Sequence, residues 1–140
     1  MWDRMTKIAA ALTGAAAGML GEWNVLLSVL AWMMGIDYLT GLICAWCGRS
    51  PKTEGGGVSS KAGFEGLARK GLMMLIVLTA TLLDRAIGSG NALFQTAAAG
   101  YYIANEGISI LENSALMGVP YPKTIADALE SLREEKNASA

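Results

Sequence analysis

The sequence predicts an all-α membrane protein, in which a bundle of four transmembrane helices is followed by a short amphipathic helix. Of its 140 residues, 53% are hydrophobic and only 16% are charged. A soluble domain of this size could not hide so much apolar surface. The apolar residues also gather into long segments separated by polar connections. We expect one membrane domain over residues 1–140, with spans at about 5–21, 25–46, 66–86 and 92–117, a loop at 48–60 and a tail at 119–140.

The first apolar segment, at about 5–21, is short for a span, which needs about 20 residues. Arg4 and Lys7 can lengthen it, because their side chains reach toward the headgroups. Gly14 and Gly18 form a small-xxx-small pattern that favours close helix packing; the alternative is an Ala/Gly-rich segment without a dedicated partner. More apolar segments follow, which favours a membrane element over a cleaved signal peptide. If this segment lies on the membrane instead, the protein has three spans.

The second segment, 25–46, is bounded by Trp23 and Trp46, as is typical of a span whose aromatic residues lie at the headgroups. Asp37 interrupts it, and Thr40 follows on the same helix face. A carboxylate at the centre of a span costs about 3 kcal/mol on insertion scales. We therefore expect Asp37 to face the bundle interior or a water path, or to be protonated.

The connection at 48–60 separates the second and third segments. Pro51 and the glycines at 55–57 exclude a continuous helix and predict a flexible loop. Ser59 or Ser60 can cap the next helix. That helix begins as an amphipathic turn and becomes apolar from Leu72 onward.

The fourth segment, 92–117, carries a stripe of polar residues. At about 100° per residue, five polar side chains share one side of the helix. They are Asn105, Glu106, Ser109, Glu112 and Asn113. In a membrane such a stripe must face other protein or a wet cavity. Together with Asp37 and Thr40, these residues are the candidates for helix contacts or for a water-facing surface.

The tail, 119–140, follows Pro120 and Pro122, which end the fourth helix. Ile125, Leu129 and Leu132 form only a narrow apolar edge, and the charges of the tail nearly cancel. We expect a solvated surface helix.

The lysines and arginines predict how the chain is oriented. They gather before the first segment, between the second and third segments, and in the tail. With four spans, all three basic stretches lie on one side of the membrane, and the positive-inside rule makes both termini cytoplasmic.

Several chemistries are disfavoured by the residue types. The chain has no histidine, and Cys44 and Cys47 are its only cysteines, so a four-ligand zinc site is not available and no metal or cofactor is expected. We interpret the two cysteines as reduced thiols. Glu106 and Glu112 are spaced like paired catalytic acids, but no substrate cleft accompanies them, so we predict no catalytic residues and no enzyme. A net charge of −1 gives no indication of nucleic-acid binding.

Three motifs together resemble the toxin-secretion/phage-lysis holin family (phage holin family 4). They are Asp37-Tyr-Leu-Thr40-Gly41, then Ser59-Ser60-Lys61 with Gly66-Leu67 and Arg69-Lys70, and Tyr102-x-x-Asn105-Glu106-x-x-Ser109-Ile110-x-Glu112-Asn113 followed by Gly118-x-Pro120. The last motif is the most specific, and the resemblance runs from Trp23 onward.

The resemblance implies a phage holin, a multi-pass protein of the bacterial cytoplasmic membrane that oligomerises and opens lesions. Its partners would be itself and membrane lipid, with an endolysin released through the lesion without direct binding, and an antiholin as a further partner. The candidate polar residues would then line the lesion or make helix contacts. We hypothesise that isolated bundles hide their acids, which have few compensating bases, and that crowding turns these polar faces toward water. The alternatives are a non-lytic toxin-export holin, a small ion channel and an antiholin-like regulator.

Overall fold

The computed structural model describes residues 1–20, 23–88 and 90–138, and in these ranges the chain is helical with no strand. The elements are α1 (Trp2–Leu20), α2 (Val25–Trp46), the 3₁₀ turn η1 (Glu54–Gly56), α3 (Ser60–Ile87), α4 (Leu93–Leu116) and α5 (Lys123–Ala138). The predicted segments are therefore confirmed as helices. The end of the first predicted segment, at Gly21, and the last two residues of the tail lie outside the described ranges.

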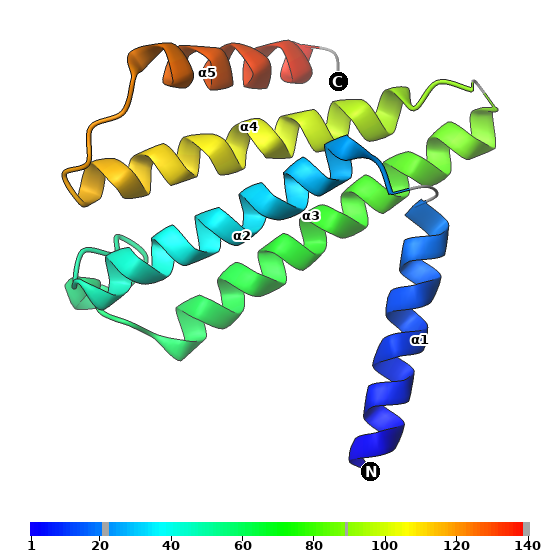
Figure 1. Ribbon diagram of the computed structural model, residues 1–140, viewed down its shortest axis with the longest axis horizontal. Helices are drawn as coiled ribbons and strands as arrows, with labels where there is room; N and C mark the ends of the chain where they lie inside the picture. The colour runs from blue at the N-terminus through cyan, green and yellow to red at the C-terminus, as the bar shows by residue number, and fades with distance from the viewer. Residues whose placement is uncertain (21–22, 89, 139–140) are drawn as a thin grey trace.

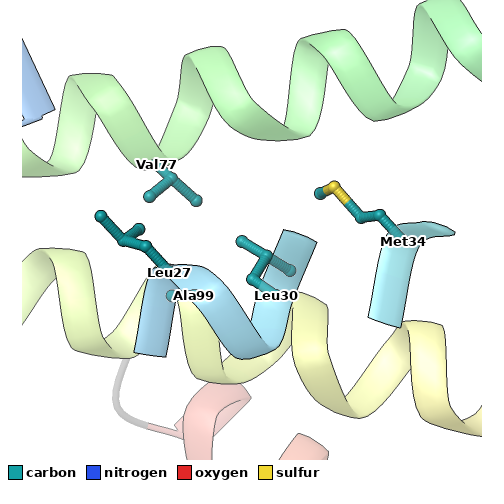
Figure 2. Close-up of a cluster of buried hydrophobic side chains, with 5 residues drawn as sticks. All are labelled: Leu27, Leu30, Met34, Val77 and Ala99. Carbon is teal, nitrogen blue, oxygen red and sulfur yellow. The ribbon is translucent and has the colours of Figure 1, made fainter. Parts of the chain in front are cut away.

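Three helices, α2, α3 and α4, run side by side and form the bundle (Figure 1). Their shared core holds Leu27, Leu30 and Met34 of α2, Val77 of α3 and Ala99 of α4 (Figure 2). Leu27, Leu30, Val77 and Ala99 are fully buried. Ala99 is small, so α4 can approach the leucines of α2 closely.

Two helices in the described part of the chain, α2 and α3, are long and apolar enough to cross a membrane. Only 22% of the most apolar window of α2 and 17% of that of α3 is buried. A core helix of a soluble protein would hide most of such a window, whereas here large side chains such as Trp32, Leu39 and Leu75 point outward. The exterior of the bundle is therefore suited to lipid.

Helix α1 extends away from the bundle (Figure 1), and its described side chains are exposed. It lies against α3 only near its end, where Arg85 NH2 donates to the Gly18 carbonyl at 3.5 Å. A Cβ atom added at Gly14 or Gly18 would meet nothing within 4 Å. Among the described residues, the small-xxx-small pattern of Gly14 and Gly18 therefore has no packing partner.

The connection between α2 and α3 is a turn closed by hydrogen bonds, whereas a flexible loop was expected. The Ser50 N–H donates to the Gly56 carbonyl at 3.0 Å, and Thr53 Oγ1 donates to the Gly57 carbonyl at 2.7 Å. Gly56 has φ +75°, and a Cβ atom there would lie 2.2 Å from the Gly48 carbonyl oxygen, so this position needs glycine. Of the two predicted caps, Ser59 is the one used, and its Oγ accepts the Ala62 N–H at 3.3 Å.

Helix α5 lies along α4 (Figure 1). It is a surface helix, as expected, with no buried residue, but one side of it is partly covered by α4. Leu129 covers Gly107, where an added Cβ would come within 2.8 Å of the leucine methyl carbons. The aliphatic part of Lys136 covers Gly100 in the same way, at 3.1 Å. The two glycines leave the space on α4 that α5 fills.

Candidate functional site

The centre of the bundle holds a buried cluster of three charged side chains, one from each helix. Lys70 Nζ of α3 lies 2.8 Å from Asp37 Oδ2 of α2 and also donates to Glu106 Oε2 of α4. The side chains of Lys70, Asp37 and Glu106 are only 13%, 8% and 5% exposed. A single ammonium group is therefore shared by two carboxylates within an otherwise apolar bundle. We refer to Asp37, Lys70 and Glu106 as the ion triad.

A polar seam continues from the ion triad along the contact between α2 and α4. Asn113 Nδ2 donates to Thr40 Oγ1 at 2.9 Å and lies 3.4 Å from Asp37 Oδ1. The Cys44 thiol donates to the Asn113 carbonyl at 3.3 Å. Gly41 also borders the Asn113 amide, since a Cβ atom added there would be in van der Waals contact with Asn113 Nδ2 at 3.7 Å. We refer to Asp37, Thr40, Gly41, Cys44 and Asn113 as the α2–α4 seam.

The helical repeat explains why these residues meet. On α2, Thr40, Gly41 and Cys44 follow Asp37 at spacings of three, four and seven residues, which lie on one helix face. On α4, Asn113 follows Glu106 by seven residues and lies on the same face, two turns further on. The two faces are opposed because the apolar core packs α2 against α4.

The structure brings together four of the predicted polar residues, namely Asp37, Thr40, Glu106 and Asn113. Asn105 and Ser109 are half-buried and line a cavity beside the ion triad. Glu112 lies on the exposed side of α4, away from the triad. Of the five stripe residues, Glu112 is therefore the one that contacts neither the triad nor the cavity, because five residues spread over about 120° of a helix cannot all face one neighbour.

Lys70 was not predicted to be a member of the site. The basic residues between the second and third segments were used only to predict orientation, and the buried acids were expected to have few compensating bases. The structure corrects this, because Lys70 reaches both carboxylates. The sequence did contain an indication. Lys70 lies two residues before the apolar run of α3 begins at Leu72, and its long side chain can reach the interior of a bundle from there.

The cavity beside the ion triad has a volume of about 230 Å³. It is bounded by α2, the turn before α3, the first turns of α3, and α4. Besides the triad, its polar lining includes Tyr38, Lys52, Ser59, Arg69, Asn105 and Ser109.

A second polar network links the beginning of α2, the end of α3 and the beginning of α4. Asp84 of α3 accepts the N–H groups of Phe94 at 3.0 Å and Gln95 at 2.8 Å, so it caps the beginning of α4 from another helix. The Gln95 amide donates to Thr81 Oγ1 at 2.8 Å and accepts from Asn24 Nδ2 at 2.9 Å. Asn24 in turn caps α2 by accepting the Leu27 N–H. Sequence reasoning did not find this network, because the residues are far apart in the chain.

Comparison with known proteins places this architecture in a family. The model of the bacteriophage holin family matches residues 14–134. An uncharacterized 14.9 kDa protein from the nagH 3′ region of Clostridium perfringens is 40% identical over 116 residues, which covers 83% of each chain. A protein of Halalkalibacterium halodurans is 35% identical over 140 residues, covering 96% of this chain and 98% of that one. No solved structure matches significantly.

One relative carries a functional name. A probable holin of Bacillus phage phi105 is 35% identical over 102 residues, covering 73% of this chain and 70% of the phage protein. The family match contains the ion triad, the α2–α4 seam and the capping network at the other end of the bundle. The chain therefore belongs to the bacteriophage holin family.

Proposed function

We propose that this protein is a lytic holin, which oligomerises in the bacterial cytoplasmic membrane and opens lesions that release an endolysin. Membership of the family implies a non-enzymatic membrane role. The observation that supports the proposal most is the ion triad, because three charged groups lie inside a bundle whose exterior is apolar. Charged groups inside a membrane bundle commonly mark water or ion paths and assembly contacts.

The proposed topology has four spans, with both termini in the cytoplasm. Helices α2 and α3 meet the length and hydropathy that spanning requires. For α4, the argument is that three of its polar groups face inward: Gln95, Glu106 and Asn113 are each at most 6% exposed, so they would not meet lipid. Helix α1 would be the fourth span, and all basic stretches would then lie on one side.

A spanning α4 cannot keep α5 beside it. Helix α5 carries acidic and basic residues along its length, including Asp127, Glu134 and Lys136, and charged side chains are costly in hydrocarbon. We propose that α5 leaves α4 on insertion and lies at the cytoplasmic surface. Gly100 and Gly107 would then be free for contact with another helix.

Lesion opening would exchange contacts within one bundle for contacts with water. In a single bundle, Lys70 and Asn113 satisfy the buried carboxylates. When copies crowd in the membrane, the α2–α4 seam separates and its polar groups face a growing aqueous gap. Hydration offsets the cost of breaking a buried ion pair, which is several kcal/mol when the charges remain buried.

The test is to express the protein in bacteria with and without a co-expressed cytoplasmic endolysin. Viability, membrane potential and enzyme release are followed. We expect sudden depolarisation, with release and lysis when the endolysin is present. Selective currents with preserved viability would indicate an ion channel instead, and inhibition of another holin without lesions would indicate an antiholin-like regulator.

A variant in the same assay tests the role of the ion triad. Glu106→Gln removes one of the two carboxylates that share Lys70, and we expect it to change the time of lesion onset. Glu112→Gln makes the same charge change on the exposed side of α4 and should keep the original onset. Unchanged onset for Glu106→Gln would reject the seam mechanism but not the holin function.

A further inference from the structure

We propose that the cavity beside the ion triad binds the phosphate of an anionic phospholipid headgroup. This inference rests on the membrane insertion proposed above. It assigns a ligand to the cavity between α2, α3 and α4, whose inner wall is the ion triad.

The position of the cavity matches the depth of lipid headgroups. Its lining extends from Asp37, midway along α2, and Glu106 of α4 to the turn before α3 and the first turns of α3. Trp46, at the end of α2, is exposed, and the apolar run of α3 begins at Leu72. Both features place the outer side of the cavity, at Lys52, where apolar helix surface gives way to polar connection, which is the interfacial region of a bilayer.

The charges of the lining favour an anion at the cavity mouth. Lys52 and Arg69 are exposed and, within the described residues, neither side chain forms an ion pair or hydrogen bond. The two carboxylates in the lining, Asp37 and Glu106, are deeper and already bind Lys70. The groups free to meet a ligand are therefore the two cations. Basic pockets between transmembrane helices bind anionic headgroups in this way, and guanidinium binds phosphate through paired N–H donors.

The cavity size and its neutral groups agree with a headgroup. A volume of about 230 Å³ is below the range of about 300–1,000 Å³ usual for drug-sized ligands, so it suits a phosphate with its glycerol rather than a larger molecule. Hydroxyl groups of Tyr38, Ser59 and Ser109 border the space and can donate to phosphate oxygens.

The surroundings favour a lipid over a soluble phosphate ester. Leu42 and Val58 line the cavity and are 42% and 59% exposed, and Leu67 is exposed on the neighbouring face of α3. Acyl chains could lie on this apolar surface while the headgroup occupies the cavity. A soluble phosphate ester would leave the same surface uncovered.

The experiment compares lipid binding by two double variants. The full-length protein is delipidated in a neutral detergent and titrated with phosphatidylglycerol or phosphatidylcholine, and bound lipid is counted by native mass spectrometry. The test variant is Lys52→Gln/Arg69→Gln. The control, Lys61→Gln/Lys123→Gln, removes the same charge from exposed residues outside the cavity lining. Circular dichroism checks that both variants remain helical.

We expect phosphatidylglycerol to bind more tightly than phosphatidylcholine, and the test variant to lose this binding by about tenfold or more, since each surface cation contributes about 1 kcal/mol to anionic-lipid binding. The control should retain most of the binding. Equal losses in the two variants would overturn the proposal, and so would displacement of the lipid by millimolar glycerol 3-phosphate, which would indicate a soluble phosphate ligand.

Flotation with phosphatidylcholine vesicles separates this inference from the proposed function. If the protein floats but shows no preference for phosphatidylglycerol, the cavity proposal fails while the holin proposal stands. If it does not float, both fail.

Discussion

At the scale of single residues, the ion triad depends on one cation. Lys70→Met keeps the length and the apolar stem of the side chain but leaves Asp37 and Glu106 buried without their shared partner. Removing one member of a buried ion pair typically costs roughly 3–5 kcal/mol. We expect the free energy of unfolding of Lys70→Met to fall by an amount in this range, measured by titration with denaturing detergent from mild micelles.

The control for this variant is Lys61→Met, which removes an exposed lysine from the first turn of α3. Lys61 lies 3.9 Å from Glu65, and exposed pairs of this kind contribute at most about 0.5 kcal/mol. If the two variants were equally stable, the ion triad would not hold the bundle together.

The sequence could predict which residues of α2 and α4 share a face, because helical spacing alone places Thr40 on the face of Asp37 and Asn113 on the face of Glu106. It could not predict that Lys70 joins them. Whether a lysine near the end of an apolar run reaches inward or outward depends on where the neighbouring helices lie, and that is not encoded in the local pattern. Glu112 was included among the candidate residues for the same reason, since the sequence does not show where the neighbouring helices lie.

At the scale of helices, the beginning of α4 is held by Asp84. Its carboxylate accepts two backbone N–H groups of α4 that have no partner within that helix, and the helix has no side-chain cap of its own. We expect Asp84→Ala to lower the free energy of unfolding by about 1–2 kcal/mol. Hydrogen exchange at the amides of Phe94 and Gln95 should become faster.

Two comparisons make this prediction specific. Asp84→Asn retains an oxygen acceptor and should recover part of the lost stability. Asp127→Ala removes an exposed carboxylate from α5 and should leave the amides of α4 unchanged. Unchanged exchange at Phe94 and Gln95 in Asp84→Ala would rule out the cap.

The bounds of the helices were largely predictable, because Pro51, the glycines at 55–57 and the prolines at 120 and 122 interrupt apolar runs. The packing of α5 was not. Its apolar edge is narrow, and the groove that receives it is formed by Gly100 and Gly107, whose missing side chains carry no hydrophobic signal. The hydrogen-bonded turn before α3 was missed for a related reason. Glycine and proline indicate where a helix is interrupted, but they do not indicate which hydrogen bonds form in the turn.

At the scale of the whole molecule, the helical bundle buries charged and polar groups beside its apolar core and leaves many large apolar side chains exposed. The composition predicted the exposed apolar surface, since 53% of the residues are hydrophobic. Within the part of the chain that the structure describes, helix α1 is without a partner along most of its length, and an added Cβ at Gly14 or Gly18 would meet nothing within 4 Å. Another copy of the chain could provide the packing partner that α1 lacks, and this is why the proposal includes oligomerisation.

The account depends most on whether the α2–α4 seam opens when the lesion forms, and the protein carries a native reporter for this. Cys44 is 1% exposed and bonds to Asn113 within the seam, whereas Cys47 is exposed. In a Cys47→Ser variant, Cys44 would be the only thiol available to a charged maleimide in open membrane fragments prepared before and after lesion onset. We predict that Cys44 is protected before onset and labelled after it, while Cys47 in a Cys44→Ser control is labelled in both. If Cys44 remains protected after the endolysin has been released, the seam stays closed and the central claim is contradicted.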